Sequence, residues 1–179
     1  MADLSVDFAN TVYLRRGRTQ DAIGDPEGLA DWLRDRRLVT GGDDASHTDV
    51  LRLRDAVRRL FAALAEGRSP DTNDVAELNV AAAQAPTWPE LRVDGDQTLL
   101  LHHTHATGRR ALLADVARDA MRVIEAATTH PLRRCAAPAC VVLYHPERAS
   151  QRWCSSACGN RARVARHHAT RRGAPAPPT

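Results

Sequence analysis

Four cysteines in the last third of the chain are the residues whose spacing best fits a chemical task. Four residues separate Cys135 from Cys140, three separate Cys154 from Cys158, and thirteen lie between the two pairs. Two short loops of this kind bend four thiolates towards one ion, and the spacer lets the chain return to close a tetrahedral site. We therefore predict one structural zinc ion held by these four cysteines.

Other uses of the cysteines have less support. Disulfides are disfavoured in a cytoplasmic chain, and the first residues, MADLSVDFAN, lack the basic lead and apolar core of a secretory signal. The cysteines could also be four buried free thiols or include a redox pair. His145 could replace one cysteine, but we expect the turn after it to point this side chain to solvent. Four thiolates leave no coordination position for water, so the zinc is expected to be structural.

The zinc site needs short elements around it. The stretch VVLYHPERASQRWC, residues 141–154, is typical of a strand, a turn containing proline and a second strand. Ser155 can cap a helix, which would place Cys158 in the first turn of that helix. The loop that carries Cys135 and Cys140 (the knuckle), the hairpin and the helix, in this order, form a treble-clef zinc finger. About 40 residues cannot bury enough surface to fold alone, so the metal would supply the stability.

Charge divides the chain into two parts. Residues 131–179 hold nine arginines and one acidic residue, Glu147, whereas residues 1–130 hold 16 arginines and 21 acidic residues, so the net charges are +8 and −5. The chain has no lysine, which indicates the codon usage of a GC-rich bacterial genome. Codon usage would enrich arginine everywhere and cannot produce this split. The C-terminal part is therefore expected to have an anionic partner.

Helix signals dominate residues 1–130. A helix is predicted within 24–39, capped by Asp25 and ended by Gly41 and Gly42, and a second within 46–67, where Ser46 and Asp49 resemble a capping box. Apolar residues at helical spacing predict two more helices, over 71–84 and from about 107 to 129.

The remaining stretches complete the predicted organisation. An Asp94-Gly95 turn predicts a β-hairpin within 91–103, and residues 4–12 fit either a strand or a helix. The predicted fold class is mainly α: a helical domain with one hairpin over 1–130, a treble-clef-like zinc finger over 131–172, and a disordered tail over 173–179.

Two stretches resemble known families. WCSSACGNRARVARHH resembles the CGNR zinc finger, named for the residues that stand here at 158–161. LSVDFANT followed by DPEGLADWLRDRRLV is similar to the helical ABATE domain, which precedes this finger in bacterial proteins. The resemblances imply a bacterial regulator of stress-induced transcription, in which the finger binds DNA and the helical domain senses a ligand. The family often has four residues between its last two cysteines; the three found here would turn the start of the helix slightly.

The helix after Cys158 is the predicted DNA contact. Val164 is the only large apolar residue between 156 and 172, so the segment lacks the apolar face of a membrane-surface helix. Its arginines would neutralise phosphates, and Arg161 would read a base or fix the knuckle. A solvated helix without a partner is the alternative. The candidates for contact with double-stranded DNA are Arg152, Arg161, Arg163, Arg166, Arg171 and Arg172.

Two further groups of polar residues call for a prediction. Asp7, Asn10 and Thr11 are the candidates for a small-molecule effector pocket, as the implied sensing role would require, and hydrogen bonds within a turn or cap are the alternative. The histidines of HHTH, residues 102–105, suggest a metal, but they alternate in direction along what reads as an exposed strand end.

The sequence also sets the broad class of the protein. It contains no nucleophile elbow, HExxH motif or Gly-rich phosphate loop, so we do not expect an enzyme. It contains no apolar run near the ~20 residues of a membrane helix. Because the first residues also lack the features of a secretory signal, we expect a cytoplasmic protein. A homodimer is compatible with the sequence. The rival to a DNA-binding regulator is an interaction module whose zinc finger binds an acidic protein.

Overall fold

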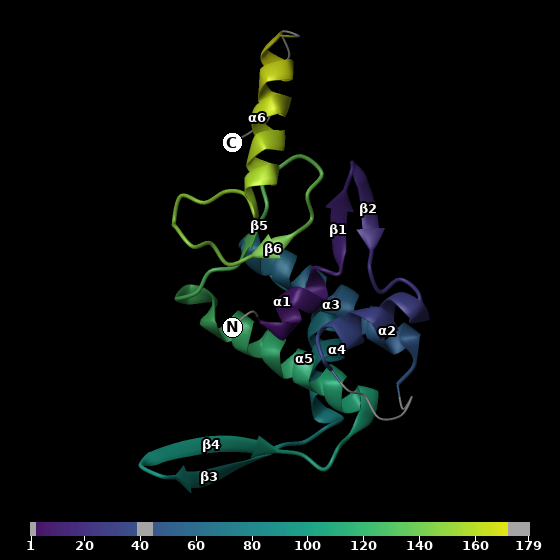
Figure 1. The fold of residues 1–179 in the computed structure, drawn as a ribbon, viewed down its shortest axis with the longest axis vertical. Helices are drawn as coiled ribbons and strands as arrows, with labels where there is room; N and C mark the ends of the chain where they lie inside the picture. The colour runs from purple at the N-terminus through teal and green to yellow at the C-terminus, as the bar shows by residue number, and fades with distance from the viewer. Residues whose placement is uncertain (1–2, 39–44, 172–179) are drawn as a thin grey trace.

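The computed structural model describes residues 3–38 and 45–171, and Figure 1 shows the order of its elements. They are α1 (Leu4–Ala9), β1 (Val12–Arg15), β2 (Arg18–Asp21), α2 (Pro26–Asp35), α3 (His47–Ala65), α4 (Thr72–Ala83), β3 (Trp88–Asp94), β4 (Gln97–His103), α5 (Gly108–Glu125), the 3-10 turn η1 (Ala126–Thr128), β5 (Arg133–Arg134), β6 (Leu143–Tyr144) and α6 (Ser156–Arg171). Helices dominate, and the mainly α fold with a C-terminal cysteine cluster is confirmed. The predicted ends at Gly41, Gly42 and 173–179 lie outside the described residues.

The helical body is built around α3 and α5. The Ser46 hydroxyl accepts a hydrogen bond from the Asp49 amide, and the Asp49 carboxylate accepts one from the Ser46 amide, so the predicted capping box is present. From this start α3 carries Val57 and Phe61 into the core, where Val116 of α5 is also fully buried. The apolar stripes read from the sequence are thus the faces that pack.

Helix α2 ends earlier than the sequence predicts. Asp25 caps it as expected, but the helix stops at Asp35. Arg37 adopts a positive φ of 55°, and the Leu38 amide donates to the Leu33 carbonyl. This is the geometry that glycine usually provides after a helix, here taken by an arginine.

Residues 4–9 form a helix, which settles the choice left open by the sequence. Phe8 of α1 is buried in the core, and the buried Ser5 amide donates to the Asp119 carboxylate of α5 at 2.7 Å. A helix of six residues is not stable alone. Its conformation is therefore set by contacts with α3 and α5, which a local pattern does not contain.

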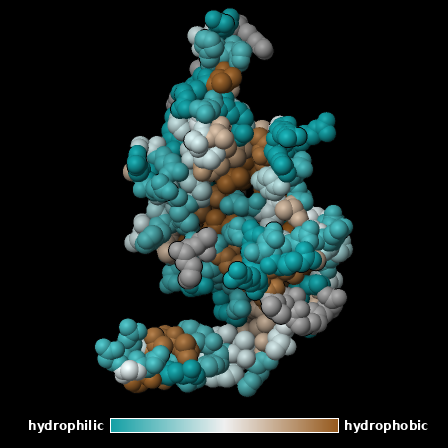
Figure 2. Space-filling view, in the orientation of Figure 1, coloured by the Kyte–Doolittle hydropathy of each residue, from teal (hydrophilic) through white to brown (hydrophobic). Residues whose placement is uncertain are grey.

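Two hairpins project from opposite ends of the body (Figure 1). The β1–β2 hairpin points to the end where α6 stands and was not predicted. The β3–β4 hairpin was predicted, but its loop is Gly95-Asp96, one residue later than expected, because Asp94 pairs with Gln97. Leu91 and Val93 on this hairpin are 72% and 73% exposed, and Figure 2 shows apolar surface there.

The C-terminal finger has a different hairpin from the predicted one. Strand β6 pairs with β5, upstream of the first cysteine, and residues 151–153 are not a strand. The reason is that side chains take the carbonyls of this segment: Arg133 donates to Ala149 and Gln151, and the Tyr144 hydroxyl also donates to Gln151. Backbone carbonyl groups that accept hydrogen bonds from side chains do not need a neighbouring strand as a partner.

Within the described residues, no helix is both long and apolar enough to cross a lipid bilayer.

Candidate metal centre and the basic helix

The four cysteine sulfurs gather at the base of α6. The Sγ–Sγ distances are 3.5 Å for Cys154–Cys158, 3.8 Å for Cys140–Cys158 and 3.9 Å for Cys140–Cys154, and all four sulfurs lie within 4.8 Å of one another. A tetrahedral ion with metal–sulfur bonds of about 2.3 Å requires sulfurs about 3.8 Å apart. The cluster therefore has the dimensions of a four-thiolate zinc site and not of disulfides, which is consistent with four free cysteines.

Two local devices bring the sulfurs together. In the first loop Ala139 takes a left-handed conformation with φ of 59°, and the Cys140 amide donates to the Ala137 carbonyl. In the second, Ser155 accepts from the Cys158 amide at 3.2 Å, so the helix starts there as predicted. Cys135 accepts a hydrogen bond from the Cys154 amide. The two loops are thus joined through the cluster itself.

The protonation of the thiols reflects their confinement. Burial raises the pKa of Cys140 and of Cys154. Burial also acts to raise the pKa of Cys158, but hydrogen bonding with Ser155 and the neighbouring thiols outweighs it and brings that pKa to about 7. Thiolates are the metal-binding form, so a cation shared by the four sulfurs offsets the cost of charging them.

Trp153 and Arg161 contact the cysteine cluster near the start of α6. A Cβ added to Gly159 would lie 3.2 Å from the Trp153 ring, so glycine permits the ring to lie against the helix. The guanidinium of Arg161 donates to the Cys158 sulfur at 3.3 Å. Of the two predicted roles for Arg161, fixing the knuckle is the one for which the structure supplies a contact.

The other DNA-contact candidates lie on the surface of α6 and its approach. Arg163 donates to the Asn160 side chain, whereas Arg152, Arg166 and Arg171 have exposed side chains without an ion-pair partner among the described residues. Arg172 lies outside the described residues. The last buried residue of α6 is Ala162. Beyond it the helix stands clear of the body (Figure 1).

The effector candidates are engaged in contacts within the protein. Asp7 pairs with Arg36, and the Thr11 hydroxyl donates to the Phe8 carbonyl at 2.8 Å. Asn10 donates to the Leu143 carbonyl at 2.7 Å and accepts from the Leu143 amide at 2.9 Å. Asn10 therefore joins the helical body to the finger in the manner of a paired strand residue, and small-molecule binding by the three residues stays a prediction.

Further contacts hold the finger on the body. Arg134 Nη1 lies 2.9 Å from Glu66 Oε1, and His145 Nε2 lies 3.1 Å from Asp3 Oδ2. The expectation that His145 points to solvent is therefore wrong, because its ring faces the helical body. Leu143, with Leu132, belongs to the apolar core of the helical body. The junction is therefore a packed interface.

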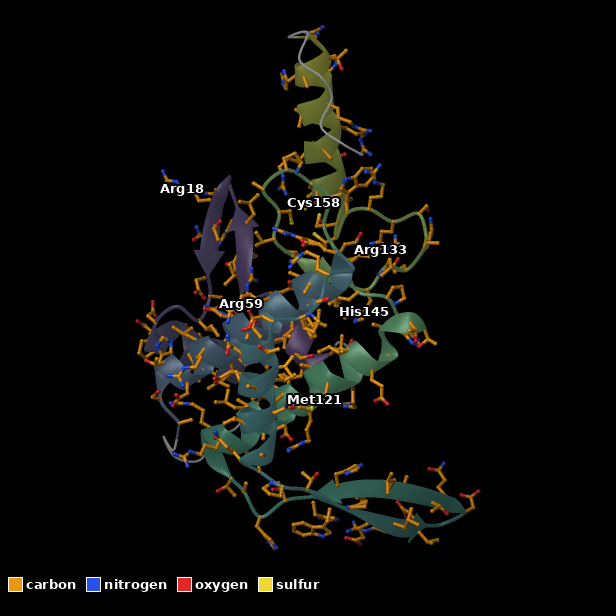
Figure 3. The ribbon with its side chains drawn as sticks, turned by 180° about the vertical axis from the view of Figure 1, so that it is seen from behind. Arg18, Arg59, Met121, Arg133, His145 and Cys158 are labelled. Carbon is orange, nitrogen blue, oxygen red and sulfur yellow. The ribbon has the colours of Figure 1, made fainter. Side chains whose placement is uncertain are left out.

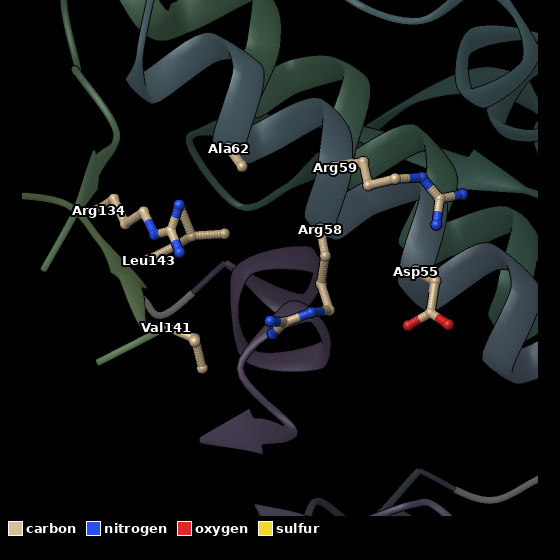
Figure 4. Close-up of a pocket in the computed structure, with 7 residues that line it drawn as sticks. All are labelled: Asp55, Arg58, Arg59, Ala62, Arg134, Val141 and Leu143. Carbon is tan, nitrogen blue, oxygen red and sulfur yellow. The ribbon is translucent and has the colours of Figure 1, made fainter. Parts of the chain in front are cut away.

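A cavity of ≈ 210 Å³ lies in this junction. Figure 4 shows Arg58 and Arg134 entering it from opposite walls, α3 and the finger. One amino group of Arg58 donates to the carbonyls of Ala9 and Val12, on either side of Asn10. Burial, and then repulsion by Arg54, lower the pKa of Arg58. Arg58 thus fixes the backbone that presents Asn10 to Leu143.

Of the three histidines predicted at a strand end, His102 and His103 lie in β4 and His105 lies beyond it. His103 ends β4 and stacks with Trp88, and the His105 ring lies 4.5 Å from the same tryptophan. Within the described ranges, the cysteine cluster is the sole group of three or more metal-type side chains close enough to share an ion.

Comparison with protein families assigns both parts of the chain. Residues 2–127, more than half of its length, match the family ABATE, described as "Putative stress-induced transcription regulator". The chain belongs to the ABATE family. Residues 132–171 match the CGNR zinc finger, which begins one residue before β5 and ends with α6. The resemblance read from the sequence is confirmed, and so is the assignment of one zinc to the finger. A comparison with curated proteins found no match.

Sequence reasoning missed two features of this ABATE protein. The β1–β2 hairpin had a local signal in Arg16-Gly17, whose φ values of 50° and 79° make a tight turn. The bridge from Asn10 to Leu143 had none, because 133 residues separate its ends.

Proposed function

We propose that this ABATE protein is a non-catalytic transcriptional regulator that binds double-stranded DNA through the helix of its CGNR finger. The observation that carries the proposal is the composition of α6. The helix bears four arginines and two histidines and no acidic residue, and none of its residues after Ala162 is buried. Beyond Ala162 the helix gains nothing from the protein's own core, whereas phosphates would neutralise its charge.

The zinc site supports this role by position. It anchors the N-terminal end of α6 through Cys158, and Arg161 lies against the Cys158 sulfur. Arg163, Arg166 and Arg171 of the same helix have exposed side chains that a duplex could contact. We assign these three arginines, together with the exposed Arg152 that precedes α6 in the chain, to phosphates. Sensing of a small-molecule effector by the helical body is the finer part of the proposal, and Asp7, Asn10 and Thr11 would act there by altering how the body holds the finger.

The test is a salt titration of duplex binding by the zinc-loaded protein. Three to five phosphate contacts give a slope of log affinity against log salt of roughly −3 to −5. Arg166→Ala should weaken binding to a selected site and to random duplex alike and flatten the slope by about one. The matched control is Arg34→Ala, which removes an exposed arginine paired with Asp31 on α2. It should leave both quantities unchanged.

Absence of duplex binding at low salt, with zinc bound and the finger folded, would overturn the proposal. An acidic protein surface would then be the better partner for α6, because it is the other common source of clustered negative charge.

A further inference from the structure

A second cluster of arginines lies at the tip of the β1–β2 hairpin. Arg15, Arg16 and Arg18 flank Gly17, and all four residues are exposed. The three guanidinium groups have no ion pair or hydrogen bond among the described residues. This tip carries a charge of +3 within a region of residues 1–130 whose net charge is −5. The tip is therefore a positive point on an otherwise acidic part of the chain.

The arginines destabilise the tip in two ways. Arg15 stands directly opposite Arg18 in the ladder, and like charges in that position repel. Arg16 has a φ of 50°, a left-handed conformation that Asn or Gly would adopt more easily at the first position of this turn. Three cations at a turn that would be more stable without them indicate a role outside the fold.

The position of the hairpin indicates what that role is. Figures 1 and 3 show the hairpin and α6 projecting towards the same end of the molecule, with Arg18 at the hairpin tip. The base of the hairpin is fixed to the body: Asp21 pairs with the buried Arg54 at 2.7 Å, and the Val12 carbonyl accepts from Arg58. The tip is thus an extended arm on a firm base, pointing the same way as the proposed DNA-binding helix.

We propose that the β1–β2 tip is a second DNA contact, which binds the phosphates or enters the minor groove of the duplex that α6 binds. This inference rests on the proposed function. A hairpin tip is narrow enough to follow a groove, and arginines are the side chains that bind the negative potential of a narrow minor groove. The helical body would then contribute to DNA binding itself, beyond the finger.

The decisive variant is Arg16→Asn. Asparagine suits the left-handed turn better than arginine, so the melting temperature should stay the same or rise, and zinc content should not change. Loss of one phosphate contact should reduce duplex affinity about eightfold at 0.1 M salt and flatten the salt slope by about 0.9. Replacing Arg15 and Arg18 by threonine as well should flatten it by roughly 2.7 in total. Arg92→Thr, on the hairpin at the opposite end, is the matched control and should have no effect.

A footprint on a selected site gives a second readout. The tip variants should shorten the protected stretch on one side and leave protection by α6 in place. Wild-type affinity and footprint in the tip variants, together with loss of binding in Arg166→Ala, would overturn this inference and leave the proposed function standing. Absence of duplex binding by the wild type would overturn both.

Discussion

Ala139, in the loop between the first two cysteines, has a backbone conformation that is unfavourable for alanine. Its left-handed conformation closes the loop between Cys135 and Cys140, although its side chain makes that conformation costly by roughly 1–2 kcal/mol. Ala139→Gly removes this cost at the expense of about 0.5–1 kcal/mol of unfolded-chain entropy. We expect the variant to hold zinc slightly more tightly, by a factor of about two to five, in competition with a chromophoric chelator.

Ala137 supplies the control for that experiment. It lies in the same loop, is buried, and has no positive φ. Ala137→Gly gains nothing from glycine's freedom and should hold zinc less tightly than the wild type. If both variants lost zinc affinity by the same factor, the assignment of backbone strain to Ala139 would be wrong.

At the scale of elements, the β3–β4 hairpin makes few contacts with the other described elements. Its strands contact each other, while Leu91 lies on an exposed face. Leu91→Ala should therefore change the free energy of unfolding by less than about 0.5 kcal/mol. Leu113→Ala, at a buried position of α5, should cost about 2–5 kcal/mol. Denaturant unfolding at two protein concentrations measures both.

The same measurement tests whether two copies associate through this hairpin. If Leu91→Ala lowers the free energy of unfolding by well over about 0.5 kcal/mol, and by more at the higher protein concentration, a second copy covers Leu91 in the wild type.

The elements that the sequence predicts well are those with local signals. The capping box at Ser46 and the stripe of α3 specify that helix without help from distant residues, and cysteine spacing specifies the zinc site. Helix α1 and the β5–β6 pairing were not predictable in this way. Helix α1 depends on a distant partner, Asp119. Strand β6 pairs with β5 across the loop that holds Cys135 and Cys140, and no turn signal marks that pairing in the sequence.

At the scale of the whole molecule, the finger and the body share part of one core. Leu132 and Leu143 come from the finger yet pack in the body's cluster, and Asn10 adds two hydrogen bonds to Leu143. Removing zinc with a chelator should unfold residues 132–171 and leave most helical circular dichroism. It should also lower the body's stability by about 3 kcal/mol or more, because two leucines lose their cover.

Cys158→Ser should reproduce the effect of the chelator, and adding zinc should not reverse it. An unchanged melting temperature of the body after metal removal would mean that the finger and the body are independent.

Helix α6 is held at one end only, which gives it the mechanics of a lever. Its 16 residues make an arm about 24 Å long. A tilt of about 10° at the zinc end displaces the far end by roughly 4 Å, slightly more than the ~3.4 Å between successive base pairs. The fulcrum lies beside the contacts that fix the finger to the body, with Asn10 and Arg134 among them. A change of about 10° in that seating would shift the outer arginines by about one base-pair step along a duplex.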